Sequence, residues 1–412
     1  MRRPRANRNG SVRAHTMQRS LPFFALALAL AAPAPAQRDI GEVEVVADNR
    51  TIPVRVSGAT AEMNALALQA FGSHGRYHLV ASGYLFDIAF SPAGPASVRV
   101  DISRGFGGGT VASEVASGSS MREALLAAAD IAVARTNGLG LRGFFSSRLV
   151  FIGKRTGKEE IYTSDLFFGD VKQITRDRAI AMTPRWAPDG EKVIYTSFFR
   201  SGFPDIFVID LGTYQRTTFV SFKGTNSGAH FSPDGRQVAM VLSGEGEPEI
   251  YVSDAYGRGV SRRTRSEATK ASPCWSPDGS RLVFAMGDPN PQLYVMPAAG
   301  GYPQRVSYNT SSYCAEPDWS RANPDKIVFT MRNGRNYQIG VLTLSQQRGE
   351  QVSKAPFDGM EPSWLPDGRH VVYTALTPYT SRVCILDTET GKSTPVSPSS
   401  FGATLQANVW AR

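Results

Sequence analysis

Residues 273–285 read PCWSPDGSRLVFA, a short stretch in which an aromatic residue precedes a tight turn and an alternating run. Pro277 pre-sets the first turn position, Asp278 bonds back to the backbone, and Gly279 takes the left-handed conformation. The run Arg281-Leu282-Val283-Phe284 that follows is β-branched and aromatic. The stretch therefore predicts one strand, a tight turn and a second strand, with Trp275 at the end of the first.

The same pattern recurs along the chain at a nearly constant interval. Its first strands read TPRWAPDG, GAHFSPDG, SPCWSPDG, EPDWSRANPD, EPSWLPDG and ANVWAR. The aromatic residues are Trp186, Phe231, Trp275, Trp319, Trp364 and Trp410, spaced by 45, 44, 44, 45 and 46 residues. Further runs follow the first strands at matching positions, for example EKVIYTSF and DIFVID. Four short strands in each unit of this length are typical of a β-propeller blade, so we expect each aromatic to pack between neighbouring blades.

The two ends of the repeat are incomplete in complementary ways. Residues 148–176 supply a second, third and fourth strand but no W-x-P-D-G strand, and residues 408–412 (NVWAR) supply only that missing strand. We therefore predict that the C-terminal strand pairs with Leu149–Ile152 and closes a ring of six blades. Closure removes the open sheet edges, whereas a solenoid would carry capping repeats instead.

The N-terminus resembles a secretion signal. Six arginines and no acidic residue lie in residues 1–36, and LPFFALALALAAPAPA at 21–36 is a short apolar run that ends in small residues. The run is too short to span a bilayer. We expect an exported, soluble chain that begins near Gln37, with Met1 and Met17 as alternative starts. Without the signal the net charge falls from +9 to +3, which excludes a strong general attraction to nucleic acid. The local cluster Arg258, Arg262, Arg263 and Arg265 is interpreted as a charged edge strand.

Residues 37–145 do not repeat and predict a small α/β domain before the propeller of residues 146–412. Strands are expected at 41–47, 53–57, 77–80, 84–90 and 97–103, and a helix at 59–71. A second helix at 119–136 begins with a capping box of Ser120 and Glu123. The glycine-rich stretch 105–109 lacks the spacing of a dinucleotide-binding loop and is interpreted as a hairpin loop.

The sequence offers little catalytic chemistry. G-x-S-x-G and H-E-x-x-H are absent, the repeated aspartates are explained by turn formation, and His230 is the only candidate for channel chemistry. Cys274, Cys314 and Cys384 show no metal-ligand spacing, and the alternatives are one oxidised pair or three buried core residues. We therefore predict a binding scaffold with no catalytic residue, cofactor or metal site. The alternatives are a secreted propeller hydrolase and an unrelated propeller binding module.

The order of parts resembles the TolB family of periplasmic propellers, as does the junction Gly138-Leu139-Gly140-Leu141-Arg142-Gly143-Phe144-Phe145. The fourth first-strand turn departs from the family pattern by a two-residue insertion at 320–325. The resemblance implies a periplasmic scaffold of the Tol-Pal system that links the lipoprotein Pal to TolA. It further implies roles in outer-membrane integrity, cell division, protein import and bacteriocin transport. The implied partners are a Pal-like lipoprotein and a TolA-like inner-membrane protein, with peripheral attachment to the outer membrane, no nucleic acid, and a monomeric chain.

The resemblance also implies where partners bind. The propeller end that carries the loops before each first strand is expected to receive Pal. Thr225, Asn226 and Ser227 occupy the place of the family's His-Asn-Gly loop, with Thr225 in place of the histidine. The corresponding loops end at Thr183, Ser272, Glu316 and Glu361. Loops between second and third strands share this end and contribute Phe198, Phe199, Phe203, Arg332 and Arg335, residue types that protein interfaces favour.

Overall fold

The computed structural model describes residues 51–411. The predicted signal segment and the strand expected at 41–47 lie outside the described residues. In the part of the chain that is described, no helix has both the length and the apolar character needed to cross a membrane.

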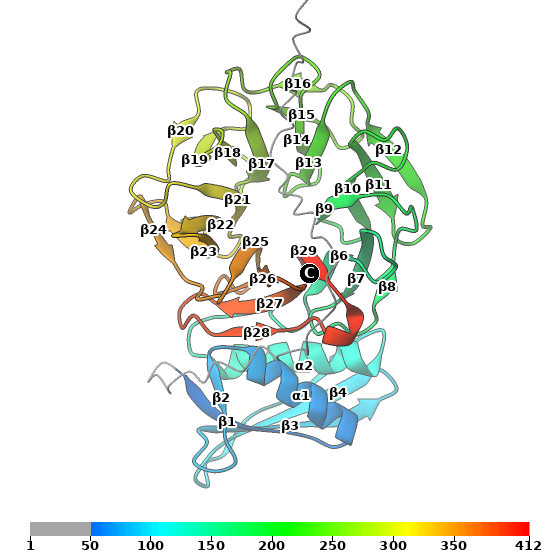
Figure 1. Ribbon diagram of the computed structural model, residues 1–412. Helices are drawn as coiled ribbons and strands as arrows, with labels where there is room; N and C mark the ends of the chain where they lie inside the picture. The colour runs from blue at the N-terminus through cyan, green and yellow to red at the C-terminus, as the bar shows by residue number, and fades with distance from the viewer. Residues whose placement is uncertain (1–50, 412) are drawn as a thin grey trace, which may run out of the picture. The chain divides into compact units, whose positions relative to one another are not determined.

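Six four-stranded antiparallel sheets form a ring of blades (Figure 1), which confirms the predicted fold class. In five blades the strands are hydrogen-bonded in chain order, and in the closing blade β29 precedes β6, β7 and β8. The first strands, β9, β13, β17, β21, β25 and β29, surround the centre of the ring. The closing blade combines β29 (Thr404–Trp410) with β6 (Arg148–Gly153), β7 (Glu160–Asp165) and β8 (Lys172–Gln173). The remaining blades are β9 (Ala181–Trp186), β10 (Lys192–Ser197), β11 (Asp205–Asp210) and β12 (Arg216–Val220); β13 (Asn226–Phe231), β14 (Gln237–Leu242), β15 (Glu249–Asp254) and β16 (Ser261–Arg262); β17 (Lys270–Trp275), β18 (Arg281–Met286), β19 (Gln292–Pro297) and β20 (Gln304–Arg305); β21 (Cys314–Trp319), β22 (Lys326–Asn333), β23 (Asn336–Thr343) and β24 (Arg348–Gln351); and β25 (Asp358–Trp364), β26 (His370–Leu376), β27 (Ser381–Asp387) and β28 (Ser393–Pro395).

The turn after Trp275 is held by its own side chains. Ser276 donates to Asp278 at 2.5 Å, the backbone N–H of Ser280 donates to the same carboxylate at 3.1 Å, and Gly279 has φ +70°. Trp275 is buried in one cluster with residues of both its own and the preceding blade, and its Nε1 donates to the carbonyl of His230 at 2.9 Å. The aromatic therefore packs between blades, as the repeat predicts.

The C-terminal strand closes the ring. β29 pairs antiparallel with β6, with Val409 opposite Leu149 and Leu405 opposite Ile152. The indole of Trp410 is buried, and its Nε1 donates across to the carbonyl of Pro188 at 3.0 Å. The ring is thus joined by both a ladder and an inter-blade aromatic.

The residues before the ring form an α/β layer. Its sheet has the order β2-β1-β3-β4-β5, and its two helices, α1 (Ala61–Ser73) and α2 (Met121–Thr136), contribute buried side chains to the sheet's core. Ser120 accepts the N–H of Glu123 at 3.2 Å, and the Glu123 carboxylate accepts the N–H of Ser119 at 2.8 Å. The capping box is present, although its return bond goes one residue earlier than expected. The strands are β1 (Ile52–Gly58), β2 (Tyr77–Leu79), β3 (Phe86–Gly94), β4 (Ser97–Arg104) and β5 (Thr110–Ser117).

Two sequence interpretations are settled by this layer and by the blades. The stretch 105–109 connects β4 to β5 as a hairpin loop, but β5 itself was not expected, because its small and polar residues lack a clear alternating pattern. Cys274, Cys314 and Cys384 are all buried free thiols, so the oxidised-pair alternative is wrong for this structure. Burial raises the pKa of Cys274 to about 12, as expected for a core thiol.

Candidate partner-binding rim

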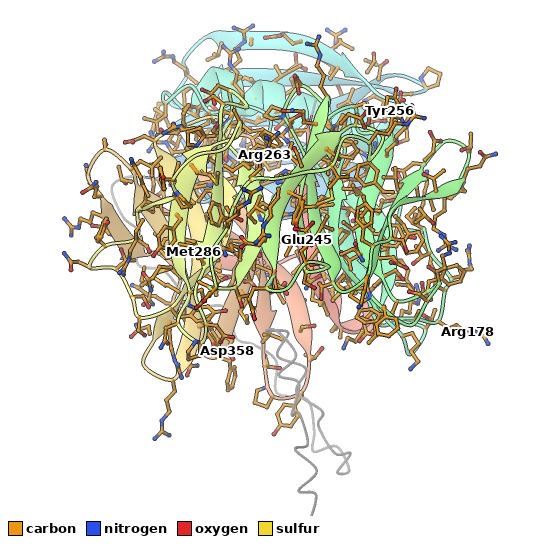
Figure 2. The ribbon with its side chains drawn as sticks, turned by 90° about the horizontal axis from the view of Figure 1, so that it is seen from above. Arg178, Glu245, Tyr256, Arg263, Met286 and Asp358 are labelled. Carbon is orange, nitrogen blue, oxygen red and sulfur yellow. The ribbon has the colours of Figure 1, made fainter. Side chains whose placement is uncertain are left out.

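The connections that lead into each first strand lie beside the connections between second and third strands. The N–H of Phe198 donates to the carbonyl of Ile180 at 3.0 Å, and that of Ser243 donates to Thr225 at 3.0 Å. We call this end of the propeller the loop rim. Figure 2 shows Arg178 and Asp358 at this end and Tyr256, on a turn between third and fourth strands, at the opposite end.

Exposed apolar and aromatic side chains gather on the loop rim. Phe203 is 67% exposed and Tyr379 is 83% exposed, although both side chains are large enough to favour burial. Such side chains, set among polar loops, are the usual anchors of protein interfaces. The set comprises Ile180, Phe199, Phe203, Phe222, Tyr308, Phe357 and Tyr379.

Phe199 is held in place by a charged group beneath it. The guanidinium of Arg216 lies 4.0 Å from the ring centroid of Phe199, forms an ion pair with Asp177, and donates to the hydroxyl of Tyr195 at 3.2 Å. Burial opposes the charge on Arg216, but the hydrogen bonds to Asp177 and Tyr195 outweigh it and raise the pKa of Arg216. The half-exposed ring of Phe199 therefore packs on Arg216, which Asp177 and Tyr195 hold in place.

Arg332 and Arg335 lie on the exposed hairpin between β22 and β23. Among the residues that the structure describes, neither side chain forms an ion pair or donates a hydrogen bond, although Arg332 is fixed through its backbone N–H to Tyr313. Free guanidinium groups at a loop tip suit a partner that carries carboxylates.

The predicted Thr225-Asn226-Ser227 site divides into two parts. Thr225 is partly exposed, whereas Asn226 and Ser227 are buried at the start of β13. The Asn226 amide donates to the carbonyls of Phe222 at 2.7 Å and Pro204 at 3.1 Å, and its Oδ1 accepts the N–H of Phe222 at 3.0 Å. Asn226 therefore shapes the loop that presents Phe222, and cannot contact a partner from its buried position.

Thr183, Ser272, Glu316 and Glu361 do not lie in loops as expected. Each sits inside a first strand, three residues before its aromatic, at an irregularity where φ is about +50°. This position holds the extra residue of a β-bulge, which changes the direction in which the side chain points. We call these positions in the first strands the bulge row. The bulge side chains therefore belong to the wall at the centre of the ring and not to the exposed loop tips.

Several of these bulge side chains join one blade to the next. Glu316 accepts the N–H of Glu361 at 2.9 Å, Glu361 accepts the N–H of Gln406 at 3.0 Å, and Gln406 accepts the N–H of Thr183 at 2.6 Å. Burial, followed by the charge of Glu316, raises the pKa of Glu361 to about 7. Sequence reasoning missed Gln406, because it stands four residues before Trp410 where the other members stand three residues before their aromatics.

His230 lies in β13 directly before Phe231, and the residues that directly precede the aromatics of the first strands form a second row around the centre of the ring. Its Nδ1 is buried without a hydrogen-bond partner, and burial together with the charges of Arg185 and Arg321 lowers the pKa of His230 well below its usual range. Asp318, in the same row, already accepts the N–H of Trp364 at 2.7 Å and the hydroxyl of Ser363 at 3.3 Å. This row therefore links blades, much as the bulge row does.

His74, Asp367 and His370 form a buried cluster that no sequence pattern indicated. Their ligand-type atoms lie within 4.8 Å of one another, the set needed for a metal ion. However, Nε2 of His370 accepts the N–H of Gly75 at 3.0 Å and Nδ1 bonds Asp367 at 2.5 Å, so both ring nitrogens are already engaged. A Cβ on Gly75 would lie 1.8 Å from Asp387, so only glycine permits this approach. His74 packs edge-on against His370, with ring centroids 4.4 Å apart, and its Nε2 is buried without a hydrogen-bond partner among the described residues. The bond from Gly75 to His370 joins the α/β layer to a blade.

A closed six-bladed ring preceded by a small α/β layer defines the class of this protein as a six-bladed β-propeller protein. Residues 138–411 match the family described as TolB beta propeller domain, which spans well over half of the chain. The chain therefore belongs to the TolB β-propeller family.

Individual relatives agree with this assignment. A TolB homologue of Chlorobium chlorochromatii is 36% identical over 145 residues, which cover 35% of this chain and 32% of that protein. The Tol-Pal system protein TolB of Desulfosudis oleivorans is 38% identical over 127 residues, which cover 31% and 28% respectively. The matched stretches thus span about a third of these relatives. The crystal structure of TolB from Acinetobacter baumannii superposes with a TM-score of 0.77 at 21% identity, covering 88% of this chain and 98% of that one, which shows the shared fold.

Proposed function

We propose that this protein is a periplasmic scaffold of the Tol-Pal system that binds a Pal-like lipoprotein on its loop rim. On this proposal it also engages a TolA-like inner-membrane protein through the segment before the α/β layer. It would support outer-membrane integrity and envelope constriction at cell division. The domain divisions after residues 36 and 145 are part of the same proposal.

The observation that carries the proposal is the number of exposed aromatics on the loop rim. Among the described residues the rim exposes six, Phe199, Phe203, Phe222, Tyr308, Phe357 and Tyr379, against three on the turns of the opposite end, Tyr214, Tyr256 and Tyr302. They share this rim with Arg332 and Arg335, whose side chains form no ion pair with any residue in the described part of the chain. Aromatics and arginines at one surface favour a protein partner, because they bury large areas and pair with carboxylates on docking. The side chains of Glu316, Glu361, Gln406 and Asp318 at the centre of the ring already bond the next blade, which favours a binding role over catalysis in the channel.

A pull-down from envelope extract tests the proposal. Tagged protein should recover a peptidoglycan-binding lipoprotein, and the double variant Phe199→Ala/Phe203→Ala should lose it. Tyr256→Ala is the matched control, since Tyr256 is a 79% exposed aromatic at the opposite end of the propeller. Folded protein that recovers no lipoprotein from an extract containing it would contradict the Tol-Pal assignment.

A further inference from the structure

A basic cavity lies between the β13–β16 and β17–β20 blades, on the side of the propeller that faces the viewer in Figure 2, where Arg263 and Met286 are labelled. Its volume is about 390 Å³, and no aspartate or glutamate lines it. The lining side chains are Arg262, Arg263, Arg265, Lys270, Met286 and Tyr302, together with neighbouring small residues.

Two of the four cations are already neutralised. Glu249 is buried and accepts from Arg262 at 2.8 Å and from Lys270 at 2.9 Å, and Glu245 pairs with Arg262 at 3.2 Å. Burial alone would raise the pKa of Glu249, but its bonds to Lys270, Thr264 and Arg262 lower it. Glu249 is therefore ionised, and its negative charge is compensated by Arg262 and Lys270.

The other two cations, Arg263 and Arg265, are not neutralised. Arg263 donates one hydrogen bond, from Nη1 to the carbonyl of Ala299 at 3.1 Å, and its Nε is buried without a partner. Arg265 is exposed and, among the described residues, forms no ion pair and donates no hydrogen bond. Buried donors are almost always satisfied in proteins, so an unmet guanidinium N–H needs an explanation.

Comparison of the blades shows that Arg263 occupies a position that is aliphatic in four other blades. The backbone N–H of Arg263 bonds the carbonyl of Ile250 at 2.8 Å, and the same bond recurs at equivalent positions in four other blades. There the residue is apolar and packs into or against a blade core: Ile174, Val306, Val352 and Val396. An arginine at a position that favours a buried aliphatic side chain breaks a local rule, and such breaks are expected at functional sites.

We propose that this cavity binds a phosphomonoester group, held by the guanidinium groups of Arg263 and Arg265. Two uncompensated guanidiniums match the charge of a phosphomonoester near neutral pH, about −1.5 to −2, and their planar donors fit its oxygens. The cavity exceeds the size of a bare phosphate, so it also accommodates the group that carries it. Tyr302, 93% exposed on the adjoining loop, and Met286 offer that group an apolar wall.

This site is separate from partner binding on the loop rim and goes beyond it. The carrier of the phosphate is either a soluble metabolite or a lipid headgroup, and two probes separate them. Glycerol phosphate represents the soluble source. Phosphatidic acid in phosphatidylcholine vesicles represents the lipid source, with pure phosphatidylcholine vesicles as the blank.

The decisive variant is Arg263→Val, which restores the residue that three other blades carry and is expected to fold normally. Isothermal titration should show saturable binding of glycerol phosphate to the wild type, weakened about tenfold or more in Arg263→Val and in Arg265→Gln. Arg99→Gln, which removes an exposed arginine on β4 of the α/β layer, should bind like the wild type. If the wild type co-sediments with the phosphatidic acid vesicles and the same variants do not, the carrier is a lipid headgroup. If the wild type binds glycerol phosphate but not the vesicles, the carrier is a soluble metabolite. Binding unchanged in Arg263→Val, or absent with both probes, overturns the proposal.

Discussion

Ring closure by β29 predicts that a residue near the very end of the chain is as important to stability as one in its middle. Trp410 is 9% exposed, its ring centroid lies 6.2 Å from that of Trp186, and its Nε1 donates to Pro188 at 3.0 Å. Truncating a buried tryptophan to alanine typically costs about 3–5 kcal/mol, including the cavity left behind. We expect Trp410→Ala to lower the free energy of unfolding by that amount.

The matched control is Trp275→Ala, which removes the equivalent aromatic from an internal blade. Trp275 is 3% exposed, and its Nε1 donates to the carbonyl of His230 in the preceding blade at 2.9 Å, whereas Trp410 bonds the turn of the following blade. Equilibrium denaturant unfolding followed by circular dichroism gives both free energies, since it does not depend on tryptophan fluorescence. Similar losses support closure, and deletion of residues 408–412 should abolish cooperative unfolding. A cost below about 1 kcal/mol for Trp410→Ala, alongside a large cost for Trp275→Ala, would refute the closure argument.

Three further perturbations follow from the site. Burial lowers the pKa of both His74 and His230, so the unfolded chain takes up protons first on acidification and stability is lost below about pH 6.5. The raised pKa values of Glu316 and Glu361 act in the opposite direction, so the test compares His230→Gln with the wild type by denaturant unfolding. The difference in free energy of unfolding should shift in favour of the variant by up to about 1.4 kcal/mol per pH unit below about pH 6.5, and a difference that does not change with pH would contradict this. The pKa of Glu361 is raised from 4.5 to about 7, so the stability that its protonated form contributes is lost as pH rises through that range. The free energy of unfolding of Glu361→Gln, measured relative to the wild type, should therefore increase by about 1–3 kcal/mol from acidic to neutral pH. A difference between the two proteins that stays constant with pH would count against this. Asn226→Ala should cost about 1–3 kcal/mol and increase hydrogen exchange in residues 221–225, whereas unchanged exchange would show that Asn226 does not hold the loop.

The ring was predictable from the sequence because each blade carries its own local signals. The aromatic recurs every 44–46 residues and is followed in four copies by Pro-Asp-Gly, and the incomplete copy at 408–412 indicates how the ring closes. The site was predictable only in part. Loop-tip residues such as Phe199 and Arg335 lie on the rim as expected, because their place depends on blade topology alone.

The missed features depend on distances between segments that are remote in sequence. Asn226 is polar and near a loop, yet its amide is turned inward to bond Phe222 and Pro204. The contact of Gly75 with His370 joins residues 295 positions apart, and no local pattern marks either one. Arg263 was interpreted as part of a charged edge strand. Only the comparison of equivalent backbone hydrogen bonds shows that the residues at the same position in other blades are aliphatic.

The proposed binding role is tested most directly by titrating a purified Pal-like lipoprotein domain against the folded protein and its rim variants. Phe203→Ala and Tyr379→Ala remove side chains that are 67% and 83% exposed, so both variants should keep the stability of the wild type. We predict a saturable one-to-one complex whose dissociation constant rises by about tenfold or more in at least one of these variants. Tyr256→Ala, at the opposite end, should leave it unchanged. Equal affinity in all four proteins, or no complex at all, would contradict the loop rim as the partner-binding surface.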